Sequence, residues 1–200
     1  MKRWTAQLLT LSTLALASAA SAAPVAGPPD RFEPVPEQYK EGVKDVAIAE
    51  KPGNTIPLDL EFIDTTGRPV KLENYFHKGR PIILQLGYFN CPMICDVISK
   101  GVMELAQELD LEMGADYDVL YVSINPKERW QLAQQKKANY VEAYGKPGAF
   151  AGWNFLVGSE LQIKKLSDAV GFKYQYLPDR NEFSHPSMIT ILTSEGVVSK

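Results

Sequence analysis

The two cysteines of this 200-residue chain lie four positions apart at the end of an apolar run, and this segment constrains the fold most strongly. Residues 81–89 are apolar and rich in branched and aromatic side chains, which is typical of a strand buried on both faces. A helix is predicted directly afterwards, with Pro92 suited to its first position. Apolar residues recur there at helical spacing, at Ile94, Ile98, Val102, Leu105 and Leu109. Cys91 is therefore expected at the start of the helix and Cys95 one turn inside it.

The spacing of Cys91 and Cys95 brings their thiols to the same side of the predicted helix. Two thiols placed in this way can close a disulfide or bind one metal ion. Unpaired N–H groups and the positive dipole end of a helix N-terminus favour the thiolate, which is the form that attacks disulfides and ligates metals. Cysteines also occur as small buried apolar residues. That interpretation leaves unexplained why both cysteines of the chain fall in one strand-to-helix corner.

The first 23 residues have the three parts of a secretion signal. Lys2 and Arg3 are followed by an apolar segment at residues 8–17 and by small residues at 20–23 that suit cleavage. A spanning helix needs about 20 apolar residues, so this segment is short for a permanent anchor. An uncleaved anchor stays open, because small residues extend the run to Ala23. We expect export, to the periplasm or an equivalent compartment, and no membrane span after cleavage.

Export and charge narrow the classes of function. An exported protein meets an oxidising compartment, where a lone cysteine pair is a structural disulfide, a redox pair or a metal site. Removal of residues 1–23 leaves 19 basic and 24 acidic residues, a net charge of −5. This balance argues against nucleic acid or an anionic membrane surface as the partner.

The rest of the chain divides into a tether and one domain. Seven of the 14 prolines lie between Pro24 and Pro57, with charged residues between them, so residues 24–55 are interpreted as a proline-rich tether. Residues 56–200 have the length of one compact domain with a single core. No internal repeat is evident.

Strands and helices alternate within residues 56–200. A hairpin is predicted at 58–64 and 68–72, further strands at 117–124, 153–157 and 188–192, and a short edge strand at 172–176. Helices are predicted at 127–144 and from Ser159, where Ser159 and Gln162 form a capping box, to a stop at Gly171. This order predicts an α/β fold with a central mixed sheet flanked by helices and an N-terminal hairpin.

A cysteine pair where a strand meets a helix in an α/β chain is the thioredoxin arrangement. Here the pair has three intervening residues, one more than the thioredoxin motif, which favours a metal site. Of the two histidines, His77 lies in a turn and is interpreted as a solvated or capping residue, with a ligand role as the lesser alternative. His185 precedes the last strand, which in a thioredoxin fold comes close to the start of the cysteine helix, and Pro186 biases its backbone toward extended geometry. Two thiolates and one imidazole suit copper in either oxidation state and, less selectively, zinc.

At this point the chain resembles the Sco/SenC family, thioredoxin-fold proteins that help to assemble the copper centre of cytochrome c oxidase. The resemblance rests on Gly87-Tyr88-x-x-Cys91-Pro92-x-x-Cys95, on the distal His185, and on the order of several shorter segments. Those segments are residues 122–126, 153–158, 170–174 and 194–196. The resemblance covers roughly residues 56–200.

The resemblance implies that Cys91, Cys95 and His185 are copper ligands. Two positions depart from the family pattern: members often have an acidic residue where Asn125 stands and a second proline where Asp96 stands. Many members are membrane-anchored, whereas this leader looks cleavable. The family pattern continues past Lys200 into a further strand and helix, so we expect the sequence to stop short of the family's C-terminus.

Two functions remain open from the sequence. The first is a metallochaperone, not an enzyme, that receives copper, from a donor protein or otherwise, and passes it to an oxidase subunit or another exported cuproprotein. The second is a thiol-disulfide oxidoreductase in which Cys91 attacks and Cys95 resolves, keeping the cysteines of a copper-site protein reduced. A structural disulfide in a binding module is a more distant alternative.

Overall fold

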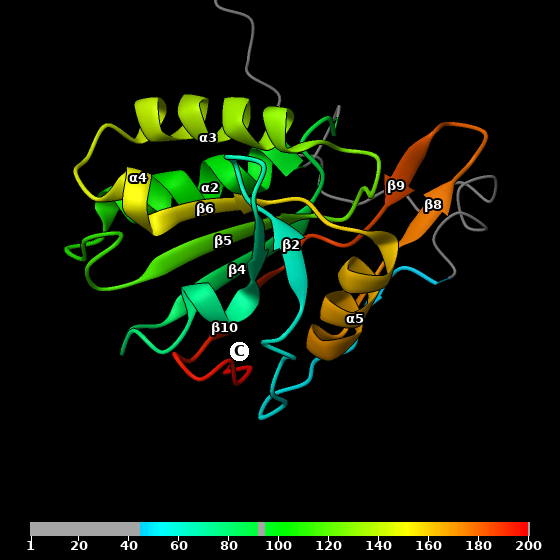
Figure 1. The fold of residues 1–200 in the computed structure, drawn as a ribbon, viewed down its shortest axis with the longest axis horizontal. Coiled ribbons are helices and arrows are strands. Elements are labelled where there is room, and N and C mark those ends of the chain that lie inside the picture. The colour runs from blue at the N-terminus through cyan, green and yellow to red at the C-terminus, as the bar shows by residue number, and fades with distance from the viewer. Residues whose placement is uncertain (1–44, 92–94, 200) are drawn as a thin grey trace, which may run out of the picture. The chain divides into compact units, whose positions relative to one another are not determined.

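The computed structural model describes residues 45–91 and 95–199, and the side chains of residues 95–97 fall outside the description. Its centre is a four-stranded sheet in the order β10-β4-β5-β6 (Figure 1). The strands are β4 (Ile82–Gly87), β5 (Asp118–Ser123), β6 (Trp153–Leu156) and β10 (Ile189–Leu192). β4, β5 and β6 run parallel, and β10 pairs antiparallel with β4. The predicted mixed sheet is therefore confirmed.

Helices cover both faces of this sheet (Figure 1). One face carries α2 (Cys95–Glu108), α3 (Trp130–Tyr144) and the short α4 (Ala149–Gly152). The opposite face carries α5 (Glu160–Val170), whose buried residues join a separate part of the core. β4 and β5 are almost wholly buried because a layer packs on each side of them, which explains their continuous apolar sequence.

In the described part of the chain, three two-stranded sheets accompany the central one. The predicted N-terminal hairpin is present as β2 (Glu61–Ile63) and β3 (Pro69–Lys71), followed by the short helix η2 (Leu72–Tyr75). The other pairs are β1 (Ala47–Ile48) with β7 (Phe172–Lys173), and β8 (Gln175–Leu177) with β9 (Glu182–Ser184). The single edge strand predicted at 172–176 is therefore wrong, because this segment splits between two different partners. One partner, β1, comes from the segment interpreted as a tether.

The buried face of α2 differs from the predicted one. Leu105 is 46% exposed, and the residues that face the sheet are Ser99, Val102 and Ala106. Ser99 accepts a hydrogen bond from Gln85 Nε2 at 2.7 Å, which anchors α2 on β4. Ile98 and Leu105 instead line a pocket together with Met188 and Ile189 at the start of β10. The helix start predicted at Pro92 and the position of Ile94 fall outside the described residues.

The ends of the other helices explain two further differences. α3 begins at Trp130 rather than at Lys127, because Asn125 Oδ1 accepts from the Lys127 N–H at 3.0 Å and forms a separate turn. Its apolar stripe packs in the core as predicted. At α5 the capping box is wrong: Ser159 has the extended N-cap conformation, but its exposed side chain makes no capping hydrogen bond. The predicted stop at Gly171 is confirmed by its left-handed φ of 76°.

Within the described ranges, none of the helices combines the length and the apolar composition that a bilayer crossing requires. The predicted leader at residues 1–23 falls outside those ranges.

Candidate functional site

A tight turn follows β4, before the cysteine helix. The backbone N–H of Cys91 donates to the carbonyl oxygen of Tyr88 at 3.2 Å, which makes Tyr88 and Cys91 the first and last residues of a β-turn. Tyr88 is buried, and Cys91 is half-buried and packs against the same part of the core. Cys95 is the first residue of α2 in the description, and its side chain falls outside it. β4 and α2 thus stand in the order inferred from the sequence, with Cys91 at the end of the turn that follows β4, and the predicted helix start falls outside the described residues.

His185 lies in the connection between β9 and β10, at the same end of the sheet as Cys91. The antiparallel register pairs Ile189 with Gln85, so residues that precede β10 come to lie beyond the carboxyl end of β4. The His185 ring contacts the ring of Tyr88, with centroids 5.9 Å apart and planes at 78°. It also lies 5.9 Å from the ring of Phe172. Tyr88 thus touches His185 through its ring and bonds Cys91 through its backbone.

The protonation state of His185 suits a metal ligand. Its Nδ1 lies 2.9 Å from the carbonyl oxygen of Pro186, which can only accept, so we assign the neutral tautomer with the proton on Nδ1. That tautomer carries the lone pair on Nε2, the nitrogen that binds metals when Nδ1–H is held by a backbone carbonyl. Burial lowers the pKa of His185, and the hydrogen bond to Pro186 opposes this only in part. The imidazole is therefore neutral near pH 7.

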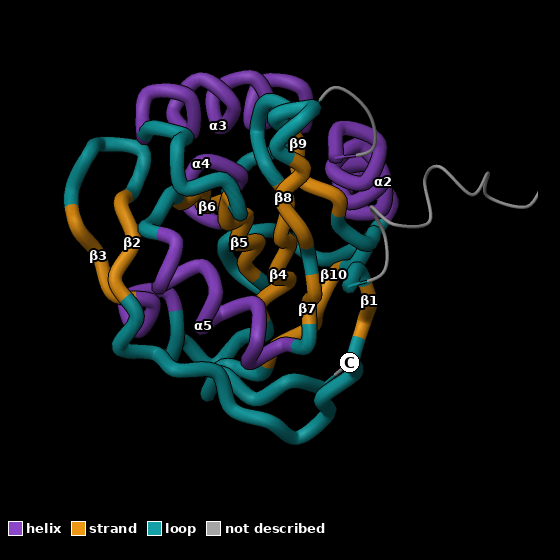
Figure 2. Tube along the Cα trace, turned by 90° about the vertical axis from the view of Figure 1, so that its right-hand side faces the viewer, coloured by secondary structure: helices purple, strands orange, loops and turns teal. Residues whose placement is uncertain are grey.

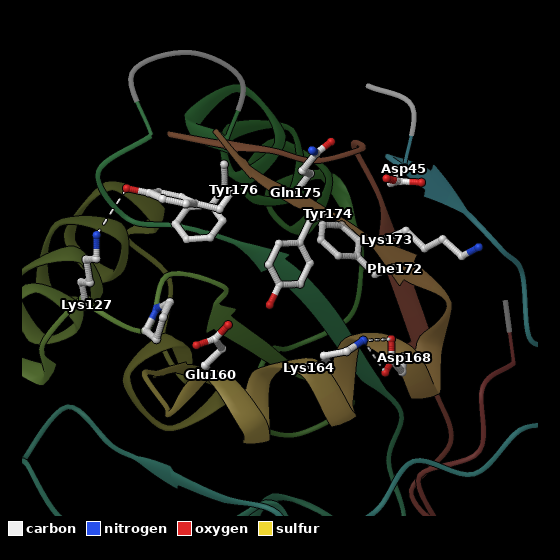
Figure 3. Close-up of a pocket in the computed structure, with 12 residues that line it drawn as sticks. Asp45, Lys127, Glu160, Lys164, Asp168, Phe172, Lys173, Tyr174, Gln175 and Tyr176 are labelled. Atoms are coloured by element: carbon white, nitrogen blue, oxygen red, sulfur yellow. Dashed lines mark hydrogen bonds and ion pairs between the residues drawn. The ribbon is translucent and has the colours of Figure 1, made fainter. Parts of the chain in front are cut away.

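Phe172, one of the two rings that contact His185, lies on the wall of a pocket of about 660 Å³ on the α5 side (Figure 3). Phe172 and Phe183 line it, and Phe183 also packs edge-on against Tyr88 at 5.7 Å. Figure 2 shows how this wall is built: β7, β8 and β9 follow one another along one side of the domain. Burial and then the carboxylates of Glu160 and Asp168 raise the pKa of Tyr174, on the pocket wall, to about 12. Packed aromatic rings thus lie next to His185 on this side of the Tyr88–Cys91 turn.

Two of the three predicted ligands, Cys91 and His185, both adjoin Tyr88. The side chain of the third, Cys95, falls outside the description. A group of three or more potential metal-ligating side chains is not found among the side chains described, a set that excludes that of Cys95. The donor chemistry of the corner, sulfur with neutral imidazole, fits copper.

His77 lies at the opposite end of β4. It precedes this strand with a φ of 59°, and its backbone N–H donates to Ser194 after β10. Its Nδ1 lies 2.8 Å from the carboxylate of Glu195, and its side chain is 48% exposed. Hydrogen bonds from Ser194 and His77 hold the pKa of Glu195 below its usual range. The structure thus agrees with the interpretation of His77 as a solvated turn residue.

Sequence reasoning missed one residue of the site, Glu128. Its carboxylate accepts from the backbone N–H groups of Phe89 and Asn90, each at 2.9 Å, and from Ser123 Oγ at 2.6 Å. These are the two central residues of the turn that ends at Cys91. The sequence does contain a signal for Glu128: it is an acidic residue two positions after the Asn-Pro that follows β5. Since β4 and β5 are parallel, this position lies at the same end of the sheet as Cys91.

Solved structures with a similar fold are numerous, whereas a search of curated proteins finds no match. A candidate electron transfer protein from Aquifex aeolicus VF5 is 26% identical, with a TM-score of 0.63, 75% of this chain covered and 83% of that chain. Arabidopsis thaliana ScoI with copper bound is 21% identical, with a TM-score of 0.55 and coverages of 75% and 86%.

BsSco, a member of the Sco family of cytochrome c oxidase assembly proteins in which a disulfide switch is identified, is 21% identical. Its TM-score is 0.57, with 77% of this chain and 86% of that chain covered. These similarities agree with the thioredoxin-like α/β fold described above. The family model for SCO1/SenC matches residues 49–200, which include both cysteines and His185, so the chain belongs to the SCO1/SenC family.

Proposed function

We propose that this chain is an exported metallochaperone that binds copper through Cys91, Cys95 and His185. It delivers the metal, as cargo, to the copper-site subunit of cytochrome c oxidase. The family match, the copper bound in the Arabidopsis relative and the assembly role given for BsSco support this proposal. Two thiolates with an imidazole form the soft ligand set that copper prefers.

One observation carries the proposal: the contact of His185 with Tyr88. The register of β10 on β4 brings a histidine from near the end of the chain to the turn that ends at Cys91. A protein that used the cysteines only for thiol exchange would need no neutral, half-buried imidazole here. Buried aromatic neighbours of His185 reduce access of water, which favours a stable metal complex.

A thiol-disulfide oxidoreductase is the second candidate. It is favoured by the half-buried Cys91 at the turn before a helix, and by the disulfide switch of BsSco. In this mechanism Cys91 attacks a client disulfide and forms a mixed disulfide, and Cys95 then displaces the client thiol. The client is reduced while Cys91 and Cys95 are oxidised to a disulfide. This cycle needs both sulfurs and does not need His185.

Replacement of His185 separates the two functions. We expect His185→Ala to weaken Cu(II) binding by at least tenfold in chelator competition, since one of three ligands is lost, while thiol-disulfide exchange proceeds at the wild-type rate. His77→Ala is the matched control, because it removes the other histidine at the far end of β4. Reduced wild-type protein should bind one copper per chain, and the oxidised protein should bind far more weakly because both thiolates are lost.

Two results would contradict the proposal. Wild-type affinity of His185→Ala for both copper oxidation states would exclude the three-ligand site and leave the oxidoreductase. Loss of copper binding together with full restoration of oxidase assembly in cells would mean that the metal site exists without being the working function.

A further inference from the structure

We infer that Glu128 is a positioning residue that holds the turn presenting Cys91. It belongs neither to the cysteine motif nor to the proposed ligand set. The consequence for copper binding rests on the proposed function, whereas the consequence for the turn and its thiol does not.

The turn before Cys91 leaves two backbone donors without a partner inside the turn. Its own hydrogen bond runs from the Cys91 N–H to the Tyr88 carbonyl oxygen. The N–H groups of the two central residues, Phe89 and Asn90, are not used by that bond. Phe89 is 2% exposed, so an unsatisfied N–H there would be destabilising.

The carboxylate of Glu128 satisfies both donors. Oε2 accepts from the Phe89 N–H and Oε1 from the Asn90 N–H, each at 2.9 Å. One oxygen therefore fixes each central residue. Glu128 is only 9% exposed, so water competes little for these charge-assisted hydrogen bonds.

Glu128 is itself held from two directions. The hydroxyl of Ser123, the last residue of β5, donates to Oε2 at 2.6 Å. The backbone N–H of Glu128 donates to the Asn125 carbonyl oxygen at 3.1 Å. Ser123 is paired with Gly87, the last residue of β4, in the parallel register. The carboxylate thus links the turn to the rigid end of the β4–β5 pair.

A carboxylate is required at this position because both neighbouring backbone groups are donors. A glutamine has the same shape, but its amide offers one acceptor oxygen and one N–H₂ group. The N–H₂ group would face a backbone N–H, so one donor of the turn would lose its partner. Glu128→Gln therefore releases one half of the turn with little change in side-chain volume.

The experiment compares Glu128→Gln with Asp118→Asn. Asp118 is also a buried carboxylate, 1% exposed, and it binds Arg80 at 2.9 and 3.1 Å at the opposite end of β4 and β5. Both substitutions turn a carboxylate into an amide. Each variant is assayed for unfolding free energy, amide exchange at residues 89–91, and Cu(I) affinity in the reduced state. The alkylation rate of Cys91 is measured in a Cys95→Ser background.

We expect Glu128→Gln to speed amide exchange at Phe89 and Asn90 by at least tenfold and to speed Cys91 alkylation. Copper affinity should fall by about 10- to 100-fold, the usual effect of losing a group that orients a ligand. Asp118→Asn should lower stability without any of these three effects. If Glu128→Gln does not fold, Ser123→Ala removes the hydroxyl that donates to the same carboxylate and accepts from the Asn125 N–H at 3.1 Å. This variant should give smaller shifts in the same directions.

Unchanged exchange at Phe89 and Asn90 in the Glu128 variant would overturn the inference. Equal changes in exchange, alkylation and copper affinity in both amide variants would also overturn it, because Glu128 would then act only through general stability. If the wild-type protein binds no copper while Glu128→Gln still speeds exchange and alkylation, the proposed function fails and the positioning role stands.

Discussion

His185 shows how burial keeps the proposed copper ligand in its neutral form. Two aromatic rings, those of Tyr88 and Phe172, contact its imidazole, and Pro186 accepts from its Nδ1. Burial lowers its pKa and so keeps the ring neutral. At the proposed copper site, a neutral ring would have no proton to lose, so deprotonation of His185 would not limit copper binding near pH 7.

This burial predicts a pH dependence of stability in the metal-free protein. As pH falls below about 6.5, a histidine in the unfolded chain takes up a proton that folded His185 resists. The free energy of unfolding should therefore decrease as pH falls from 7.5 toward 5. His185→Gln should show a shallower decrease in urea denaturation over this range. Parallel curves for the variant and the wild type would contradict the assignment of the effect to His185.

At the scale of elements, the end of α5 decides where the aromatic wall forms. Gly171 has a φ of 76°, and its carbonyl oxygen accepts from the Ala49 N–H at 2.8 Å. A Cβ at this position would collide with the carbonyl oxygen of Ala49. The next residue, Phe172, begins β7 and contacts His185. The pairing of β1 with β7 is thus tied to a glycine and adjoins the candidate site.

Two glycine substitutions separate backbone strain from this steric clash. Gly145 ends α3 with a φ of 68°, and a Cβ there would meet only an atom 3.9 Å away. Gly145→Ala should cost about 1–2 kcal/mol of unfolding free energy from the left-handed conformation alone. Gly171→Ala should cost clearly more, because β1 must also move. Equal losses in urea denaturation would mean that the contact with Ala49 contributes nothing.

At the scale of the whole molecule, the candidate ligands come from distant parts of the chain. Cys91 follows β4, and His185 precedes β10, the last strand of the central sheet. The antiparallel pairing of these neighbouring strands brings the two segments to one end of the sheet. The site therefore depends on the complete sheet, and a fragment that ends before β10 would keep both cysteines and His185 without the strand pairing that brings His185 to Tyr88.

Export is the remaining prediction about the whole chain. Cells that make the full sequence should contain a mature protein that begins near Ala23 or Pro24, because the small residues at 20–23 suit signal cleavage. N-terminal sequencing of the purified protein measures this directly. Recovery of protein that begins at Met1 in the membrane fraction would instead establish an uncleaved anchor.

The sequence by itself determined the mixed α/β sheet, the strand-to-helix corner with Cys91, and the placement of His185 before the last strand of that sheet. These features follow from local patterns: apolar runs, helical spacing and turn residues. Only the tertiary structure decided the pairing of β7 with β1, the inward face of α2 and the hydrogen bonds of Glu128 to the turn. Each depends on contacts between residues far apart in the chain, which local periodicity does not encode. Glu128 reaches the turn because β4 and β5 are paired in parallel, so the ends of two distant segments become neighbours.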